Sequence, residues 1–359
     1  MLFIGAGCSK AVGSKDLLGL TLKAKDELKK NGYGDVLTQI EARLESVNKN
    51  HQFFNEREID LEVILSILNA STDYKGALKE MGPFTIYLSA FADITKLSVQ
   101  QIGAEDLTRM RNMIGKVITT NVKTYSKDKA VRYYRDLFQI PIDLDNKYKT
   151  FTDTTNSPPL FAHTVTTNYD RVIENFYEDV YGKPPRIGFI VDEKTQERYL
   201  DTEGIISGKY RASNTSIEYL KLHGSIDWWI RSSDKRIVQR EHSKSLRGEK
   251  YPGQLMLFPV YEKHISEDPY FALYYYFRHL LNINNAYLVI GYSFRDPSIN
   301  NAFRDALTNK PASRIIIVNN NRKAIENRVN EIFPQNKVEF VEDQFGSSNL
   351  PSVLKSYLK

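Results

Sequence analysis

Several short apolar segments of this chain end in glycine or in a polar side chain, and many are followed by a helical stretch. The segment "MLFI" (1–4), for example, runs directly into "GAGCSKAVG". A strand that enters a glycine-rich turn and then a helix typically begins a nucleotide-binding α/β unit. Because short apolar strands alternating with helices form mostly parallel sheets covered on both faces, we predict a Rossmann-like α/β fold. The expected strands are 1–4, 163–167, 217–222, 254–260, 286–291, 314–318 and 337–341, and the expected helices between them are 170–181, 269–283, 297–308 and 322–333.

Residues 16–150 depart from this pattern. Apolar residues recur there at intervals of three and four, which is typical of amphipathic helices, and little resembles a strand. We therefore expect a Rossmann-like domain made of 1–15 and 151–359, with 16–150 as a helical insertion subdomain. The polar intervals 182–216 and 231–252 are expected to form loops or a small β-ribbon. The expected helical stretches of the insertion are 16–30, 58–68, 74–97 and 105–122.

The composition is that of a soluble globular protein. Hydrophobic residues make up 41% and charged residues 26% of the 359 positions, which is enough for a sizeable core. The apolar run 286–292 is far too short to span a bilayer, and no charged start followed by an apolar stretch indicates a signal peptide. We therefore expect a cytoplasmic protein without membrane contact. The net charge is +5, and the basic patches 23–30 and 231–250 are interpreted as solvated surface, with direct nucleic-acid binding as the alternative.

A single cysteine, Cys8, limits the metal and disulfide chemistry of the chain. A disulfide within the chain and a multi-cysteine zinc cluster are both impossible with one cysteine. The six histidines show no HxxxH or HExxH spacing. We therefore expect no zinc and no structural metal.

The first motif is "GAGCS", which comprises Gly5, Ala6, Gly7, Cys8 and Ser9. Its glycines allow a tight turn and let a pyrophosphate approach the backbone N–H groups, while the following helix N-terminus favours negative charge. The alternative is a tight structural turn in which Ser9 caps the helix.

The second and third motifs are "TTNYD" (166–170) and "LHGS" (222–225), and each ends an expected strand. Thr167 and Asn168 would lie at the carboxyl edge of the sheet, where ligands bind in such folds. Asp170 would bring an acceptor to the same edge, or would cap the next helix. His223 can project into a cleft and accept a proton near neutral pH, or can be a structural histidine.

The last two motifs are "GYSFRDPSIN" (291–300) and "IIIVNN" (315–320). Gly291 and Ser293 can bring backbone and hydroxyl groups close to a ribose or phosphate. Asp296, followed by Pro297, is interpreted as a helix N-cap. Asn319 can hydrogen-bond the ribose of a nucleotide, or can belong to an ordinary turn. Agreement among all five motifs, each at a strand's carboxyl end, indicates a nucleotide site more strongly than any one of them.

This ordered set resembles the sirtuin superfamily, whose members carry a GAG-x-S turn, a QN-x-D motif, an HG motif, a G-[TS]-S motif and a strand ending in Asn. Two departures concern the deacetylases of that superfamily. Their zinc module needs four cysteines, which this chain lacks, and Thr167 replaces their glutamine. The sequence motifs "TTNYD", "KLHGS" and "GYSFRDPSI", together with a helical insertion, more closely resemble those of the bacterial defence-associated sirtuin-like NADases. Members of that group deplete cellular NAD on phage infection, usually after activation by a partner or fused module.

The resemblance implies hydrolysis of NAD to nicotinamide and ADP-ribose, with NAD as the substrate. Asn168 would orient the ribose and a water, and His223 would bond a ribose hydroxyl or act as the general base. Asp170, with Thr167 beside it, would help to hold the carboxamide. The residues implied to contact the rest of NAD are Gly5, Ala6, Gly7 and Ser9 at the pyrophosphate, and Gly291, Ser293 and Asn319 at the adenosine side.

Two other functions remain open at this stage. A protein deacylase would share the NAD pocket, and so would a non-catalytic module that senses NAD or ADP-ribose. Because no activating module is evident in the chain, we expect regulation by homo-oligomerisation or by a protein partner. The family suggests a hexameric translocase-type ATPase or an argonaute-type protein as that partner.

Overall fold

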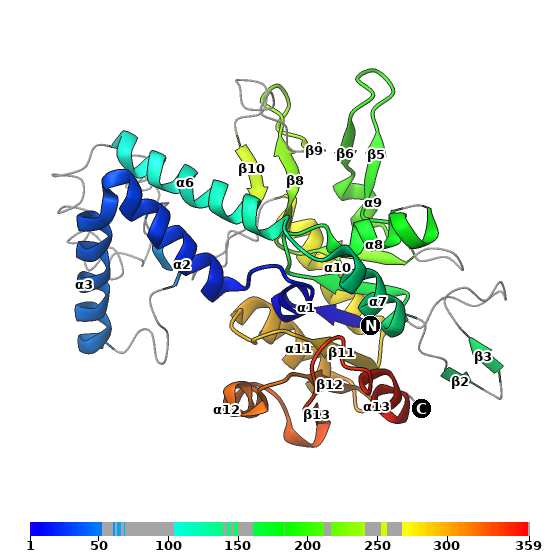
Figure 1. Cartoon of the computed structure of the whole chain (residues 1–359). Coiled ribbons are helices and arrows are strands. Elements are labelled where there is room, and N and C mark those ends of the chain that lie inside the picture. Colours follow the sequence, from blue (N-terminus) through cyan, green and yellow to red (C-terminus); the bar gives the residue numbers. More distant parts are fainter. Residues whose placement is uncertain are drawn as a thin grey trace. The chain divides into compact units, whose positions relative to one another are not determined.

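The computed structural model describes residues 1–51, 60–61, 63–65, 68, 104–138, 142–144, 147–149, 161–182, 184–211, 217–240, 253–256 and 268–357. The chain divides into two compact units (Figure 1). The first includes Met1–Ser14, Tyr125–Leu257 and His264–Lys359, and the second includes Lys15–Thr124. Each unit is described by itself.

A six-stranded parallel sheet forms the centre of the first unit, which confirms the predicted α/β class. Every neighbouring pair of strands in this sheet is parallel. Six of the predicted strands lie in it. In spatial order they are β13 (Val338–Val341), β12 (Arg314–Val318), β11 (Ala286–Ile290), β1 (Leu2–Ile4), β4 (His163–Thr166) and β7 (Glu218–Lys221).

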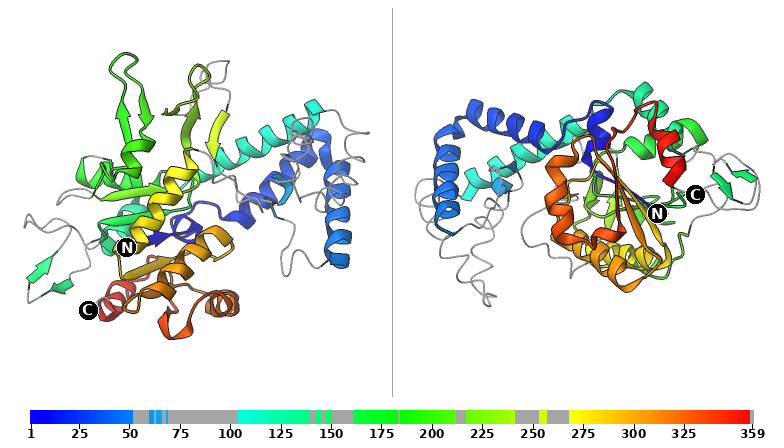
Figure 2. Two further views of the ribbon diagram at one scale, coloured as in Figure 1. Left: turned by 180° about the vertical axis from the view of Figure 1, so that it is seen from behind. Right: turned by 90° about the horizontal axis from the view of Figure 1, so that it is seen from below.

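Helices cover both faces of this sheet, as predicted (Figure 2). Successive strand side chains point to opposite faces, so Phe3 packs into one core and its neighbours Leu2 and Ile4 into the other. The Phe3 core includes α10 (Tyr270–Ile283), α11 (Pro297–Asn309) and α12 (Arg322–Ile332). The other core includes α1 (Ala6–Ala11), α7 (Lys127–Phe138), α8 (Val172–Tyr181) and α13 (Leu350–Tyr357).

The order of the strands reverses between β1 and β11. From β1 the chain adds β4 and then β7 on one side, and later adds β11, β12 and β13 on the other. In open α/β sheets, ligands bind outside the carboxyl ends of the strands at such a switch point. The turn after β1 and the loop after β11 therefore occupy the position where a nucleotide site is expected.

The first unit also contains an antiparallel sheet, whose strand β8 follows β7 after a turn of two residues. Its order is β10-β8-β9-β6-β5, and β8 (Gly224–Ile230) is its longest strand. The other strands are β5 (Phe189–Val191), β6 (Arg198–Leu200), β9 (Ile237–Gln239) and β10 (Gly253–Met256), and a short helix, α9 (Thr202–Ile206), follows β6.

The described part of the expected strand 254–260 lies outside the parallel sheet. This part, within β10, pairs antiparallel with β8. Apolar runs indicate a strand but not its partner, because strand pairing depends on chain topology. The expected β-ribbon corresponds to β5, β6 and β9, and Trp228 and Trp229 are both buried in β8.

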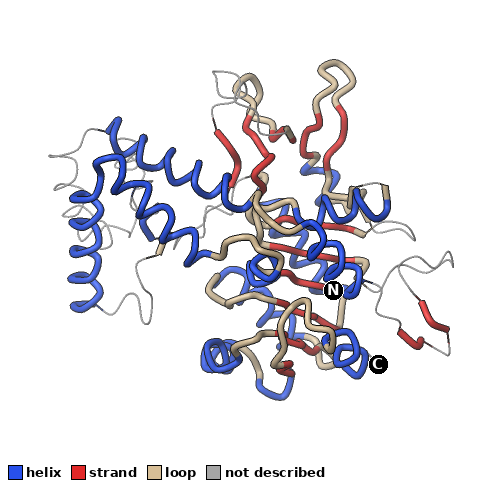
Figure 3. The backbone as a smooth tube through the Cα atoms, viewed as in Figure 1, coloured by secondary structure: helices blue, strands red, loops and turns tan. Residues whose placement is uncertain are grey.

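Helices α2 (Leu17–Leu28), α3 (Gly34–His51) and α6 (Ala104–Val122) make up most of the described part of the second unit (Figure 3). The Asp16 side chain caps α2 by accepting a hydrogen bond from the Gly19 N–H at 3.0 Å. Between α2 and α3 the chain kinks at Gly32, whose φ is +85°. Helices α2 and α6 agree with the predicted stretches 16–30 and 105–122, whereas α3 was not predicted. The predicted stretch 74–97 lies outside the described residues.

Helix α7 belongs to the first unit, whereas the expected insertion ran to residue 150. Its aromatic side chains pack on α8, with ring centroids 5.7 Å apart for Tyr134–Phe176 and 5.8 Å apart for Phe138–Phe176. This contact is long-range, so helical periodicity alone could not assign α7 to the sheet. A two-stranded ribbon, β2 (Ile142–Leu144) with β3 (Lys147–Lys149), was also not predicted.

Candidate functional site

Three glycines let the turn after β1 and the loop after β11 cross in direct contact. A Cβ on Gly5 would lie 2.5 Å from the Gly291 carbonyl oxygen, and one on Gly7 would lie 2.8 Å from the Gly291 Cα. Gly291 itself has a φ of +66°, and a Cβ there would lie 2.7 Å from the Cys8 nitrogen. Backbone atoms cannot move aside as a flexible side chain can, so glycine is required at all three positions.

The same crossing uses the backbone donors that the sequence assigned to a pyrophosphate. The Gly5 N–H donates to the Ile290 carbonyl and the Gly7 N–H donates to the Gly291 carbonyl, both at 2.9 Å. These two donors are therefore engaged inside the protein. Ala6, between them, is exposed.

Ser9 does not cap the helix, so that alternative was wrong. Helix α1 begins at Ala6 and Ser9 lies within it. The Ser9 hydroxyl donates to Asp170 Oδ2 at 2.6 Å and accepts from Asn168 Nδ2 at 2.9 Å. A hydroxyl can both donate and accept, and Ser9 uses this to link the turn after β1 with the loop after β4.

Asn168 is buried, and its side-chain orientation is fixed by its partners. Its Nδ2 donates to the Gly5 carbonyl at 3.1 Å as well as to Ser9. Because a carbonyl oxygen can only accept, the atom facing Gly5 must be the amide nitrogen. Its backbone N–H donates to Thr166 Oγ1 at 3.0 Å, which holds the loop against the end of β4.

The remaining atom of this amide, Asn168 Oδ1, is buried and has no hydrogen-bond partner among the residues that the structure describes. An unpaired buried acceptor costs roughly 1–3 kcal/mol, and such atoms call for an explanation such as an unseen ligand or water. The network thus fixes the nitrogen side of the amide and leaves the oxygen side available.

Asp170 has both carboxylate oxygens engaged. Oδ2 accepts from Ser9, and Oδ1 accepts from the Val172 N–H at 3.0 Å, which covers an otherwise unpaired donor at the start of α8. The N-cap of α8 is Arg171 rather than Asp170, so Asp170 holds the first helical N–H from one position before the cap and also holds Ser9. Thr167, which precedes Asn168, is half-buried.

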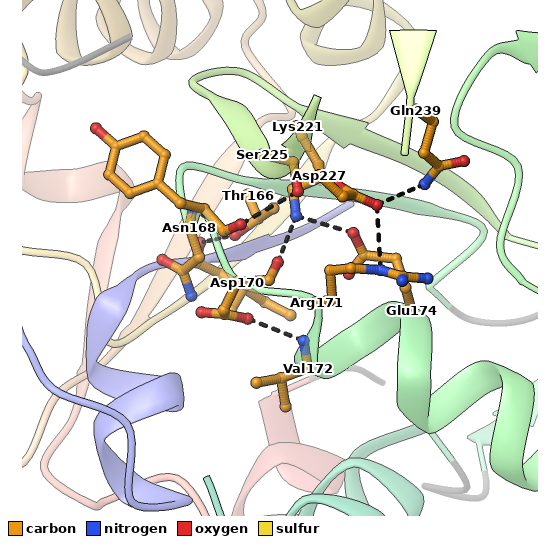
Figure 4. Close-up of polar contacts among 12 residues, drawn as sticks. Thr166, Asn168, Asp170, Arg171, Val172, Glu174, Lys221, Ser225, Asp227 and Gln239 are labelled. Carbon is orange, nitrogen blue, oxygen red and sulfur yellow. Dashed lines mark hydrogen bonds and ion pairs between the residues drawn. The ribbon is translucent and has the colours of Figure 1, made fainter. Parts of the chain in front are cut away.

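A fully buried lysine holds this loop in place. Lys221 Nζ donates to the Asp170 carbonyl oxygen and to Glu174 Oε1, the latter at 2.8 Å (Figure 4). The exposed fractions of the Lys221 and Glu174 side chains are 0% and 1%. Burial raises the pKa of Glu174, and the positive charge of Lys221 opposes that rise. The sequence did not predict this pair, because a lysine at the end of an apolar strand is normally expected to be exposed at the surface.

A second ion pair, between half-buried Arg171 and buried Asp227, lies beside the first. Arg171 Nε is 3.2 Å from Asp227 Oδ2, which also accepts from Gln239 Nε2 at 2.8 Å (Figure 4). Asp227 belongs to β8 and Gln239 to β9, so this contact joins the loop after β4 to the antiparallel sheet.

His223 lies in the two-residue turn between β7 and β8 and is 4% exposed. Its Nε2 is 3.2 Å from the Tyr274 hydroxyl and 3.2 Å from Asp296 Oδ2. The next residue, Gly224, has a φ of +77°, and a Cβ there would lie 2.3 Å from the Leu255 carbonyl oxygen. Glycine after the histidine is therefore required for the chain to pass between the two sheets.

Asn168 and His223 come from equivalent points of adjacent strands. Thr166 pairs with Lys221 in the β4–β7 register, and each site residue lies two positions beyond its strand's paired residue. Tyr169 extends the connection, because its ring centroid is 6.2 Å from that of His223. The structure thus brings the two strand-end motifs together at one edge of the sheet.

Asp296 is a site residue that the sequence analysis assigned only to capping. Its Oδ1 does cap α11, by accepting from the N–H groups of Ser298 at 3.0 Å and Ile299 at 3.4 Å. Its Oδ2 faces His223 and accepts from the Tyr274 hydroxyl at 3.4 Å. An Asp-Pro pair at a helix start has a sufficient local explanation, so the sequence gave no signal of the second contact.

The predicted adenosine-side residues have local contacts. Ser293 is exposed, and its carbonyl oxygen accepts from Arg328 Nη1 at 2.7 Å. Asn319 Oδ1 accepts from the Asn321 N–H at 2.9 Å, which is the turn that had been considered for it. Its amide NH₂ is the group that can donate to a ribose hydroxyl.

Among the residues that the structure describes, no group of three or more His, Cys, Asp or Glu side chains is placed to hold a metal ion. No helix in the described ranges is both long and apolar enough to cross a bilayer.

Residues 162–339 match the protein family described as SIR2-like domain. The matched stretch begins just before β4 and ends within β13, so it includes Asn168, His223 and Asp296. No curated protein is significantly similar to the chain. A SIR2-like domain implies NAD use and a sirtuin-like, NAD-related activity, and the predicted sirtuin resemblance is confirmed at this level.

Proposed function

We propose that the SIR2-like domain in residues 162–339, completed by β1 and its turn, hydrolyses the nicotinamide–ribose bond of NAD. The observation that carries the proposal is the buried Asn168 Oδ1, which has no hydrogen-bond partner among the described residues, while the amide nitrogen of the same side chain makes two hydrogen bonds. A ribose hydroxyl or a water molecule is the donor that such an oxygen needs. The residues present therefore fit NAD as a substrate.

The reaction consumes one water. The water oxygen forms a bond to the anomeric carbon of the ribose, and the carbon–nitrogen bond breaks with its electron pair moving to the nicotinamide nitrogen. NAD⁺ and water give nicotinamide, ADP-ribose and one proton. Such glycosidic cleavage passes through an oxocarbenium-like state, so the protein must hold the ribose and place the water on the face of the reacting carbon opposite the departing nicotinamide.

Particular residues of this chain are assigned to orienting the ribose and the water and to accepting a proton. Asn168 orients a ribose hydroxyl or the water through Oδ1, and His223 bonds a ribose hydroxyl or accepts the proton of the water. Ser9 and Asp170 act through Asn168, because their hydrogen bonds fix its amide. The three glycines allow the two loops to meet at the switch point, where the pyrophosphate would pass.

The hydrolase is favoured over a protein deacylase by the cysteine count. Protein-deacetylating sirtuins hold a zinc module with four cysteines, and this chain has one. The two activities leave different products, because a deacylase transfers the acyl group to ADP-ribose whereas a hydrolase gives plain ADP-ribose.

The biological role we propose is NAD depletion in bacterial anti-phage defence, triggered by homo-oligomerisation or a protein partner. This role is supported by the sequences of the motifs "TTNYD", "KLHGS" and "GYSFRDPSI", which resemble those of the defence-associated NADases. A hexameric translocase-type ATPase and an argonaute-type protein are the candidate partners. A constitutively active NADase would be toxic to its own cell, which is why a trigger is expected.

The test is nicotinamide release from NAD by the purified chain, together with cellular NAD in bacteria that express it, with and without phage infection. We expect Asn168→Ala and His223→Ala to lower the rate by at least about 100-fold while the fold is retained. Matched controls are Asn309→Ala, at the exposed end of α11, and His279→Ala, half-buried on α10. Undiminished NAD consumption by folded site variants, or no NAD loss by the wild type in any of these settings, would refute the proposal.

A further inference from the structure

We propose that Asp296 is a positioning residue that fixes the proton of neutral His223 on Nε2, so that Nδ1 is the nitrogen that accepts a proton or hydrogen bond from water or ribose. The inference rests on the proposed function, and it deepens it by assigning roles to the two ring nitrogens. The geometry that carries it is the buried contact of His223 Nε2 with Asp296 Oδ2 at 3.2 Å.

The contact is buried and made from fixed positions. The exposed fractions of the two side chains are 5% for His223 and 4% for Asp296. The backbone of His223 is held in a turn of two residues between sheets, and Asp296 is held by the cap that its other oxygen makes on α11.

The ionic state of Asp296 decides the direction of the hydrogen bond. Its carboxylate lies at the N-terminus of a 13-residue helix, which stabilises negative charge, and it accepts the N–H groups of Ser298 and Ile299. A carboxylate is an acceptor only, so the ring nitrogen that faces it must carry the proton. A neutral imidazole then has its lone pair on Nδ1.

Tyr274 reinforces the same arrangement. Burial, followed by the negative charge of Asp296, raises the pKa of Tyr274 well above its ordinary value, so its hydroxyl keeps the proton. That hydroxyl donates to Asp296 Oδ2 at 3.4 Å and presents its oxygen 3.2 Å from His223 Nε2. A carboxylate and a neutral phenol thus face this nitrogen, and both can accept an N–H.

As a chemical consequence, the two ring nitrogens have different roles. Nε2–H donates to Asp296 and orients the imidazole, while Nδ1 accepts a proton or a hydrogen bond from water or ribose. If Nδ1 takes the proton of the water during hydrolysis, the imidazolium that forms is stabilised by the adjacent carboxylate. This is the way in which an orienting aspartate assists a catalytic histidine in general.

The tautomer can be measured directly with ¹⁵N-histidine-labelled full-length chain by long-range ¹H–¹⁵N NMR spectra near pH 7.5. The six histidines are distinguished by the signal that disappears in His223→Gln. We expect wild-type His223 to show the Nε2–H tautomer. A wild-type His223 that is protonated on Nδ1 instead would overturn the inference whatever the activity.

The variant Asp296→Asn keeps an oxygen for the helix cap and turns an amide NH₂ towards Nε2. We expect its His223 to move to the Nδ1–H tautomer, with a kcat for NAD hydrolysis roughly 10²–10⁴-fold lower and little change in KM. Asp296→Ser, which also caps helices, is the second variant and should lose activity similarly.

Asp201→Asn is a matched control. Asp201 caps α9 by accepting the Gly204 N–H at 2.9 Å, and its other oxygen accepts the Tyr210 hydroxyl at 2.6 Å, so it repeats the Asp296 arrangement without a histidine partner. It should leave the His223 signal and kcat unchanged. An unchanged tautomer in Asp296→Asn refutes the inference, whereas failure of the proposed function appears separately as no nicotinamide release by the wild type.

Discussion

Replacing Lys221 by methionine tests whether the loop that holds Asn168 depends on a buried charge. Methionine fills a similar volume and removes the ammonium group that contacts the Asp170 carbonyl and Glu174. Glu174 would then be a carboxylate buried without its counter-charge. We expect this substitution to be among the most destabilising single changes in the first unit.

The magnitude follows from the burial of the pair. Removing one partner of a buried ion pair costs about 3–5 kcal/mol, because the other charge stays uncompensated. For a unit of this size, that corresponds to a fall in melting temperature of roughly 6–20 °C. The matched control is Lys127→Met, which breaks an ion pair with Asp179 of the same 2.8 Å length whose lysine is 66% exposed. Surface pairs of this kind contribute little, so the control should be nearly neutral.

The pH dependence has a definite sign. Burial raises the pKa of Glu174 in the folded protein, so folding favours its protonated form. Its contribution to the free energy of unfolding is therefore fully present below its ordinary pKa and is lost as pH rises through the raised value. In Lys221→Met the opposing attraction is gone, so the loss with rising pH should be larger than in the wild type.

Urea unfolding followed by tryptophan fluorescence measures this, since both tryptophans, Trp228 and Trp229, lie in the first unit. The double variant Lys221→Met with Glu174→Gln should recover part of the loss, because no buried charge is then left unpaired. A Lys221→Met variant as stable as Lys127→Met, or a double variant with no recovery, would contradict the reasoning.

Three further predictions concern the crossing of the two loops. Gly291→Ala should lower the stability measured in urea more than Gly182→Ala does. Both glycines have φ near +66–69°, but only a Cβ at position 291 would press against backbone atoms. Equal losses of stability in the two variants would rule out this steric reason. The Cys8 thiol, which is fully buried and has a pKa raised by burial and then by the charge of Asp170, should react with a maleimide only on unfolding, and rapid labelling of the native protein would argue against a closed turn. Ser9→Ala should cost about 1–3 kcal/mol and lower kcat more than it raises KM, because it releases the Asn168 amide; steady-state kinetics with unchanged kcat would separate Ser9 from the site.

Much of the fold follows from the sequence because it depends on local pattern. Apolar segments such as 286–290 and 314–318 form strands wherever they pair, and a strand that is buried on both faces belongs to a parallel sheet covered by helices. Parallel strands also end at one edge, so the proximity of the motifs containing Asn168 and His223 follows once the sheet is accepted. The requirement for glycine at Gly5 and Gly291 is likewise visible as a pattern, although its reason was not.

The tertiary structure decided which partner each polar group meets. The N–H groups of Gly5 and Gly7 donate hydrogen bonds to carbonyl groups at the end of β11, some 285 residues away, and so are not free to bind a phosphate. Asp296 caps its helix as its local sequence indicates, and it also meets His223, which the sequence places 73 positions earlier. Lys221 and Glu174 become a buried pair because β7 and α8 pack together. Local sequence sets what a residue can do, and the long-range packing of strands and helices selects which of those contacts is made.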